Sequence, residues 1–282
     1  MRLSDAAFAR MKQDLARRRK EAMEDLVREL KMPEEVGAWI TSVPKAPPHY
    51  SLNEYCNRHG GTVAVPIALG SGLACSAVEF FEGEDMISHA ASLSSQGHKV
   101  ALLNMANATS VGGGFLSGAR AQEEQLCHRS TLFLKLKQYR WYGNYPIRRG
   151  TCLLTPDVRI LLGHDFAPQQ EASVSVVSAC ANRYATEADA RKDKDLLRSL
   201  RDTWLAVLSA AAASGSEIVV VSAIGCGAFQ NPPEAAGRAL ASALSDCSPG
   251  RLRRVHVAIL EDHNSRDNTL RFRKGFDDAF RS

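Results

Sequence analysis

Short apolar and β-branched runs alternate with helical patterns along the chain from Thr62 onward. This alternation predicts an α/β fold, because strands separated by amphipathic helices assemble into a sheet that the helices cover. We expect strands over 63–66, 77–81, 100–103, 151–154, 158–162, 174–178, 218–222 and 255–259. We expect helices over 85–95, 119–137, 193–214 and 233–247, with Trp204 in the core.

The first fifty residues have a different pattern from the rest. Apolar residues recur at helical spacing among many charges up to about Ser42, and a proline-rich stretch from Pro44 to Tyr50 follows. We therefore predict two parts, a helical extension with its linker over 1–50 and one mixed-sheet domain over 51–282. The basic run Arg17 to Lys20 could touch a polyanion, although a solvated helix face explains it more simply.

Charge and cysteine usage exclude several classes of protein. The formal net charge of +4 neither repels polyanions nor indicates a general nucleic-acid surface, so we expect no direct sequence-specific nucleic-acid binding. The seven cysteines are scattered without a CxxC pair, which favours free thiols and argues against a zinc site. No stretch approaches the roughly 20 apolar residues of a membrane helix. We expect a cytoplasmic protein, or a nuclear one if the source is eukaryotic.

Two segments have the order strand, glycine-bearing loop, helix. Gly112, Gly113 and Gly114 follow the expected strand 100–103, and the loop 223–233 follows the expected strand 218–222. Glycines accept positive φ and let a ligand approach the main chain, and a helix start directs free N–H groups at an anion. Because ligands of open α/β sheets bind beyond the strand ends, the two loops predict a diphosphate site. Ordinary structural turns are the alternative.

Two consecutive glutamates, Glu123 and Glu124, stand at the start of the helix that follows the glycine triplet. On a helix they point about 100° apart, so one can bind while the other reacts. A glutamate against an apolar wall has a raised pKa and can protonate a leaving oxygen, as in the cleavage of glycosidic bonds. The alternative is that both carboxylates favour the helix dipole and have no further role.

Six other residues are candidates for a role at the site or in the fold. Asn107 could bind a sugar hydroxyl or cap its own turn, and Phe229 in the second loop could stack on a ribose or a base. Arg129 and Ser130 are better suited to packing and hydrogen bonding than to the chemistry. Asp262 and His263 could form an acid/base pair, but a turn is the simpler interpretation.

The triplet Gly112–Gly114, seven further residues and then Gln122, Glu123 and Glu124 resemble the GGG and QEE signature of the poly(ADP-ribose) glycohydrolases, whose catalytic domain is a macrodomain. Three blocks occur in the order of the compact bacterial-type branch: VALLNMANATSVGGGFLSGARAQEEQLCHRSTLF, NYPIRRGTCLLTPDVRIL and VVVSAIGCGAFQNPPEAAGRAL. The resemblance extends from about Val63 to Phe280. Met105 and His128 depart from it, where an aromatic residue and a second arginine are usual.

The resemblance implies a macrodomain-like mixed β-sheet sandwiched between helices. It also implies that Glu124 is the catalytic acid/base, that Glu123 and Asn107 hold hydroxyls of the ribose being cleaved, and that Phe229 braces the terminal ribose. The two loops would surround the diphosphate, with no cofactor and no metal. The residues expected to contact ADP-ribose are Asn107, Gly112, Gly113, Gly114, Phe115, Gln122, Ile224, Gly225, Cys226, Gly227, Ala228, Phe229 and Asn231.

The expected reaction is mainly exo-acting hydrolysis of the O-glycosidic ribose–ribose bonds of poly(ADP-ribose), which releases ADP-ribose and reverses protein ADP-ribosylation. The expected partners are poly(ADP-ribose) or an ADP-ribosylated protein. One alternative is a hydrolase of single ADP-ribose units joined to protein through arginine or ester links. A second is a macrodomain that binds ADP-ribose without cleaving it, although the presence of both glutamates argues against that. A nucleotide-sugar enzyme on a similar sheet is a third.

Overall fold

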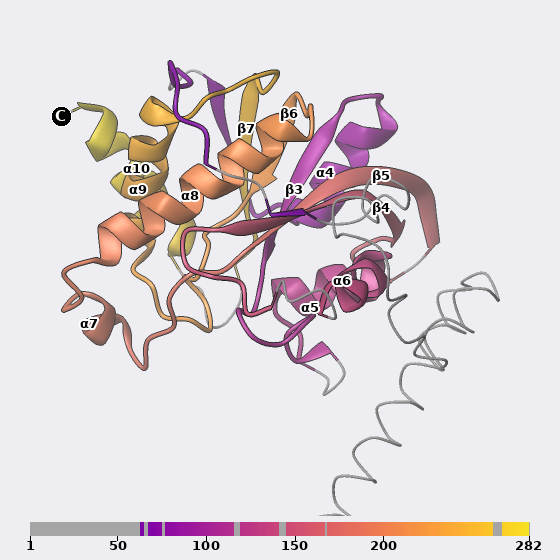
Figure 1. Ribbon diagram of the computed structural model, residues 1–282, viewed down its shortest axis with the longest axis horizontal. Helices are drawn as coiled ribbons and strands as arrows, with labels where there is room; N and C mark the ends of the chain where they lie inside the picture. The colour runs from indigo at the N-terminus through magenta and orange to yellow at the C-terminus, as the bar shows by residue number, and fades with distance from the viewer. Residues whose placement is uncertain are drawn as a thin grey trace, which may run out of the picture.

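Seven strands form one mixed sheet in the part of the chain that the computed structural model describes (Figure 1). That part comprises residues 63–64, 67–74, 77–115, 119–140, 145–166, 168–261 and 267–281. The predicted N-terminal extension and the pair Asp262 and His263 lie outside the described residues, and so do Cys56 and Cys75.

The sheet has the strand order β1-β4-β5-β3-β6-β7-β2. Neighbours from β5 to β2 run parallel, whereas β4 is antiparallel to β5 and β1 is antiparallel to β4. The strands are β1 (Val63–Ala64), β2 (Val78–Glu82), β3 (Val100–Met105), β4 (Cys152–Leu162), β5 (Pro168–Ala179), β6 (Ile218–Val221) and β7 (Arg254–Ile259).

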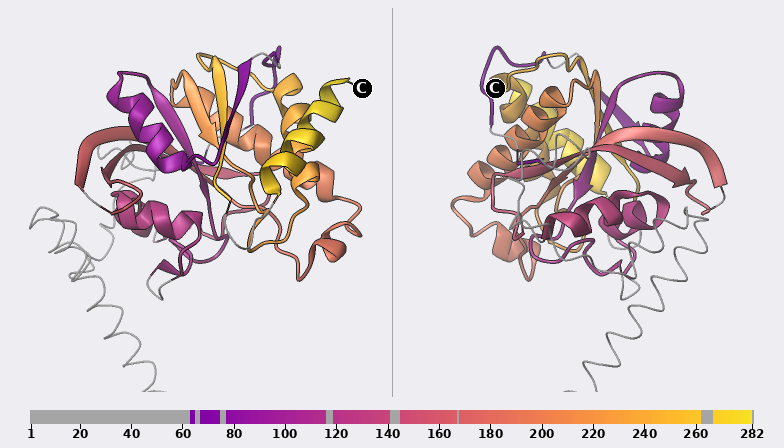
Figure 2. Two further views of the ribbon diagram at one scale, coloured as in Figure 1. Left: turned by 180° about the vertical axis from the view of Figure 1, so that it is seen from behind. Right: turned by 45° about the vertical axis from the view of Figure 1, so that its right-hand side comes forward.

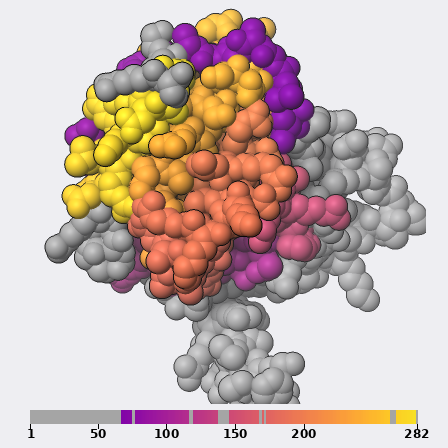
Figure 3. Space-filling model, turned by 90° about the vertical axis from the view of Figure 1, so that its left-hand side faces the viewer, coloured from indigo at the N-terminus to yellow at the C-terminus, as the bar shows by residue number. Residues whose placement is uncertain are grey.

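Helices cover both faces of the sheet (Figure 2). They are α4 (Met86–Ser95), α5 (Gln122–Arg129), α6 (Leu132–Arg140), α7 (Glu187–Ala190), α8 (Leu196–Ala213), α9 (Pro233–Asp246) and α10 (Asn268–Arg281). Two consecutive residues of β2 show the layering, because successive strand residues point to opposite faces. Phe80 contacts Phe272 and Phe276 of α10, and Phe81 contacts His89 of α4. The fold is the predicted macrodomain-like α/β sandwich, and Figure 3 views it from the side that bears α7, α9 and α10.

Two predicted boundaries are wrong for local reasons. The expected strands 151–154 and 158–162 are the single strand β4, whose register shifts between Thr155 and Val158 beside Asp157 at φ 52°. The expected helix 119–137 is interrupted at Ser130, whose extended backbone pairs with Ile160 and separates α5 from α6. The helices α7 and α10 were not predicted.

The core prediction for Trp204 is confirmed. Its side chain is fully buried and its indole N–H donates to the carbonyl of Ala236 at 3.0 Å, which joins α8 to α9. These two helices pack against the sheet, and the carboxyl ends of its parallel strands are followed by loops. Within the described ranges, no helix combines the length and apolar character needed to span a bilayer.

Candidate active site

Three connecting segments gather where the parallel strands β5, β3 and β6 end. We call residues 106–115 after β3 the first glycine loop and residues 222–231 after β6 the second glycine loop. Both leave neighbouring parallel strands, so they meet at one edge of the sheet. The segment 180–186 follows β5 and touches the second loop: Tyr184 N–H donates to the Phe229 carbonyl at 3.1 Å. Two loops and one connecting segment thus frame the predicted site.

The start of α5 is fixed to β3 by Gln122. Its side-chain Oε1 accepts from the Met105 N–H at 2.8 Å, and its Nε2 donates to the Leu103 carbonyl at 3.0 Å. Both ends of this amide are therefore used inside the protein, although the sequence placed Gln122 among the substrate contacts. Its structural effect is to hold the first turn of α5, and with it the two glutamates, against the sheet.

Glu123 is buried, with 3% of its surface exposed. Its Oε2 accepts from the Asn107 N–H at 2.7 Å, and its Oε1 lies 3.4 Å from the Asn104 Nδ2. Burial raises the pKa of Glu123 to about 8, against the lowering effect of these hydrogen bonds, and the charge of Glu124 adds to the rise. Glu123 therefore keeps its proton at neutral pH.

Glu124 is held by one oxygen only. Its Oε1 accepts from the Gly114 N–H at 2.7 Å, and the residue is 7% exposed. Its Oε2 is buried and has no hydrogen-bond partner among the described residues. A buried carboxyl oxygen without a partner is costly unless it carries a proton or meets a ligand. Glu124 therefore has the geometry of a proton donor that waits for an acceptor.

The first glycine loop is closely fitted to these carboxyls. A Cβ on Gly113, which has φ +58°, would lie 2.2 Å from Glu124 Oε1 and 2.9 Å from Glu123 Oε2. The amides of this loop are not bare as the sequence suggested. Gly112 and Gly114 donate to the two glutamates, and the N–H groups of Gly113 and Phe115 donate to Ser110 and Gly112 within the loop. The loop thus orients the carboxyls.

The second glycine loop has the opposite arrangement. Among the described residues, no acceptor is found for the amides of Gly225, Gly227, Ala228 and Phe229. Asn231 supports the loop through its side-chain Nδ2, which donates to the carbonyls of Asn182 at 2.7 Å and Gly225 at 3.1 Å. A fixed loop with open N–H groups is suited to an anion.

A hollow of about 550 Å³ lies beside the second loop, lined by Arg183, Tyr184, Ala185, Ala228 and Gln230. The half-buried Phe229 stands in the sequence between two of these lining residues, and the Arg183 guanidinium carbon lies 5.9 Å from its ring centroid. Arg183 is exposed and Phe229 is not fully packed, so both can contact a ligand. This arrangement fits the stacking role predicted for Phe229.

Several predicted contacts have structural uses. Asn107 Oδ1 caps its own turn by accepting from the N–H groups of Thr109 and Ser110, both at 3.0 Å, which was the alternative left open for it. Phe115 is 5% exposed and packs on the rings of His128 and Phe133. The side chains of two members of the second loop are buried as well, so their main chain alone can face a ligand: Ile224 and Cys226.

The structural role predicted for Arg129 and Ser130 is confirmed. Arg129 is fully buried, and its Nη1 lies 2.7 Å from an oxygen of Asp85, at the start of α4. Ser130 Oγ donates to the Leu126 carbonyl at 2.6 Å. These contacts fix the far end of α5, as Gln122 fixes its beginning.

Sequence reasoning missed two residues at the glutamate pair. Asn104 on β3 is fully buried; its Nδ2 donates to Ser178 Oγ at 3.0 Å, while its Oδ1 has no partner in the described part of the chain. The Tyr145 hydroxyl is likewise buried without a partner there, and burial together with the charge of Glu123 raises the pKa of Tyr145. A lone amide in the apolar run VALLNM was the signal for Asn104.

Within the described residues, no group of three or more His, Cys, Asp or Glu side chains could hold a metal ion. The five cysteines in the described part are free and buried.

Known proteins resemble this chain in sequence and in fold. Residues 73–160, which include the first glycine loop and both glutamates, match the family model described as "Microbial-type PARG, catalytic domain", where PARG stands for poly(ADP-ribose) glycohydrolase. No curated protein matches the chain. The crystal structure of PARG from Deinococcus radiodurans in complex with ADP-ribose is similar at 26% identity and a TM-score of 0.61, over 71% of this chain and 85% of that one.

Two structures from Thermomonospora curvata share the fold over more of the chain. Its PARG is 24% identical with a TM-score of 0.68, over 92% of this chain and 99% of that one. The same enzyme bound to the inhibitor ADP-HPD is 23% identical with a TM-score of 0.65, over 91% and 98%. These matches confirm the resemblance drawn from the sequence: the chain is similar to the bacterial-type branch of the poly(ADP-ribose) glycohydrolases.

Proposed function

We propose that the protein hydrolyses the O-glycosidic ribose–ribose bonds of poly(ADP-ribose), mainly from the chain end, and releases ADP-ribose. The observation that carries this proposal is Glu124. One of its oxygens is fixed by the Gly114 N–H, and the other is buried without a partner among the described residues. Binding alone would not need such a group, whereas cleavage of a glycosidic bond needs a proton donor.

The reaction proceeds at the free oxygen of Glu124. The carboxyl gives its proton to the departing ribose oxygen while the bond from that oxygen to C1″ breaks. The ionised carboxylate then takes a proton from water as the water oxygen bonds to the oxocarbenium-like C1″. The water is consumed, Glu124 regains its proton, and both products end in hydroxyl groups.

The remaining residues bind and orient the substrate in this proposal. Glu123 and the amide group of Asn107 hold hydroxyls of the ribose being cleaved. The open amides of the second glycine loop hold the diphosphate, and Phe229 packs against the terminal ribose. The first glycine loop, whose amides are already bonded to the glutamates, contributes mainly by keeping the two carboxyls in place.

Glu124→Gln tests the mechanism, because the amide keeps the shape of the carboxyl but cannot give the proton. We expect turnover of labelled poly(ADP-ribose) to fall by about 10²- to 10⁴-fold, while ADP-ribose still binds in calorimetry. Glu217→Gln, at a half-exposed glutamate, is the control. Full activity of the Glu124 variant would contradict the mechanism.

The choice of substrate tests the reaction class separately. The wild-type protein is incubated with a poly-modified protein and with mono-modified proteins that carry arginine or ester links. We expect release of ADP-ribose from the polymer. Cleavage of the mono-modified proteins alone would replace the proposal by the mono-ADP-ribosyl hydrolase, and binding without cleavage would leave a reader of ADP-ribose.

We also propose that residues 51–282 form the catalytic domain and that the protein acts in the cytoplasm. The buried free thiols support a reducing compartment. Cell fractionation with an antibody to the chain tests the location. Activity of a 51–282 fragment equal to that of the full chain tests the boundary, and an inactive but folded fragment would contradict it.

A further inference from the structure

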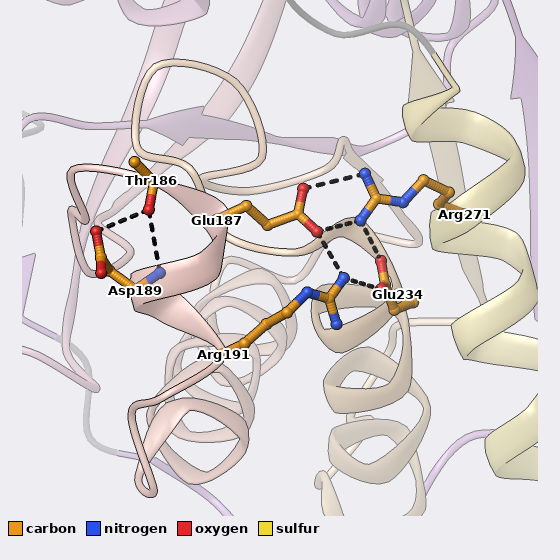
Figure 4. A network of polar contacts seen from close by, with 6 residues as sticks. All are labelled: Thr186, Glu187, Asp189, Arg191, Glu234 and Arg271. Atoms are coloured by element: carbon orange, nitrogen blue, oxygen red, sulfur yellow. Dashed lines mark hydrogen bonds and ion pairs between the residues drawn. The ribbon is translucent and has the colours of Figure 1, made fainter.

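We propose that four charged side chains behind the second glycine loop form a closed ring of ion pairs that positions this loop for substrate binding. The ring consists of Glu187, Arg191, Glu234 and Arg271 (Figure 4). The inference rests on the proposed function, since it concerns the loop that would hold the diphosphate. These residues are positioning residues, because none of them lines the hollow or bonds to the glutamate pair.

Each arginine of the ring bridges both glutamates. Arg271 Nη1 donates to Glu187 Oε2 at 3.1 Å, and its Nη2 donates to Glu187 Oε1 and to Glu234 Oε2, the latter at 2.8 Å. Arg191 Nη2 donates to Glu187 Oε1 at 2.5 Å and also to Glu234 Oε1. Removing one arginine therefore opens the ring and leaves the two glutamates joined through the other arginine alone.

The ring joins the short helix α7 to α9 and α10, which already pack closely against each other at Gly237 and Gly275. Glu187 and Arg191 belong to α7 and the residue after it, Glu234 lies in the first turn of α9, and Arg271 comes from α10. The helix α7 has only four residues, and its Thr186 cap bonds to Asp189 within the same turn. So short a helix is not stable by itself. External contacts such as the ring must hold it.

The contacts of the ring lead directly to the second glycine loop. Glu234 follows Asn231 by three residues, and Asn231 Nδ2 donates to the Asn182 carbonyl. On the other side, Glu187 follows the segment 180–186, whose Tyr184 N–H donates to Phe229. The ring thus closes a circuit through α9, the second loop, this segment and α7. That circuit includes the residues that line the hollow, which are 183–185 together with Ala228 and Gln230.

The charges of the ring explain why its role is positioning. Two arginines and two glutamates cancel, so the ring adds no net attraction for a polyanion. Mutual pairing lowers the pKa of Glu187, by its bonds to the arginines, and raises the pKa of Arg271, so all four groups stay charged at neutral pH. Their side chains are about one-third to one-half exposed, from 31% for Glu234 to 49% for Arg191. Salt should therefore weaken the ring.

The test compares Arg271→Met with Arg273→Met. Both arginines lie on α10, but Arg273 pairs with Glu82 and Asp277 instead of the ring. We expect Arg271→Met to raise KM for poly(ADP-ribose) and Kd for ADP-ribose on the order of tenfold, about 1.4 kcal/mol, while kcat at saturating substrate changes less than about twofold. Arg273→Met should leave all three constants at wild-type values.

Added KCl and a second variant make the test decisive. In the wild-type protein KM should rise with KCl toward the value of Arg271→Met, and it should rise less in that variant. If Arg271→Met does not fold, Arg191→Met replaces it, and Arg271→Lys should recover part of the lost affinity. A lower Tm with unchanged KM and Kd would show that the ring only stabilises the fold. Absence of ADP-ribose binding by the wild-type protein would instead contradict the proposed function.

Discussion

The two glycine loops have the same local design, a parallel strand followed by glycines and a helix, but they use their amides in opposite ways. In the first loop Gly112 and Gly114 donate to Glu123 and Glu124. In the second loop Gly225, Gly227, Ala228 and Phe229 have no acceptor within the described part of the chain. One loop is closed around carboxyls of the protein, and the other is open to an anion from outside.

This difference separates two requirements of a glycosidic site. An acid must keep one orientation, because a proton transfer depends on distances of a few tenths of an ångström. A cradle for a diphosphate must keep its donors unsatisfied until the ligand arrives. The same residue type therefore has two purposes. Gly113 avoids a collision with the glutamates, whereas Gly227, whose Cβ would meet nothing within 4 Å, leaves room for a ligand.

Gly113→Ala should have the largest effect, and it should be on turnover. The new Cβ would displace the carboxyls, which approach its position to 2.2 Å and 2.9 Å. We expect kcat for poly(ADP-ribose) to fall on the order of 10²-fold, with a much smaller change in the Kd of ADP-ribose. Gly215→Ala is the control, because it also has a positive φ, +73°, but nothing lies within 4 Å of its Cβ. Equal losses of kcat in both variants would show that backbone strain, and not displacement of the carboxyls, causes the effect.

Gly227→Val should have a smaller effect, and it should be on binding. The side chain would project into open space at the second loop, so the fold should tolerate it while the ligand loses room. We expect KM and the Kd of ADP-ribose to rise about tenfold, with kcat nearly unchanged and an unchanged Tm. A fall in kcat without a change in Kd would show that the second loop serves the chemistry, and the contrast between the loops would disappear.

The sequence predicts the two glycine loops and the two glutamates, but it does not predict that the loops use their amides in opposite ways. Apolar runs such as 218–222 were enough to locate β6, and the spacing of glycines and glutamates indicates the candidate site. The long strand β4 was divided in two because Pro156 and Asp157 interrupt its pattern where the register shifts. Whether an amide is bonded or open depends on which acceptor folds against it, as Glu124 does at Gly114. The positions of the glycines in the sequence do not show whether their amides are bonded or open.

Asn104 illustrates the same limit. One polar residue in a buried strand can be recognised in the sequence, but its partners Glu123 and Ser178 lie on α5 and β5 and meet it only in the folded sheet. The ring of Glu187 and Arg271 is similar, since those residues are 84 positions apart. Local patterns predict elements well, whereas polar contacts between distant elements follow from the topology.

The protonation of Glu123 tests the first glycine loop, and its expected effect is the smallest of the three. Its pKa is about 8 in the folded protein and near its ordinary 4.5 in the unfolded chain. Between pH 4.5 and about 8, Glu123 keeps its proton in the folded state and has lost it in the unfolded chain. The free energy of unfolding should therefore fall as pH rises through this window, by at most about 1.4 kcal/mol per pH unit, and the loss should end above about 8.

Urea unfolding across this window, with Glu123→Gln beside the wild-type protein, measures the effect. The variant should show a flatter slope, because its amide does not titrate, and Glu217→Gln at a half-exposed position should keep the wild-type slope. Parallel slopes in all three proteins would show that Glu123 is ionised in the fold. In that case the amides of the first loop would stabilise an ionised Glu123, and the first loop would itself be an anion site filled by a side chain of the protein.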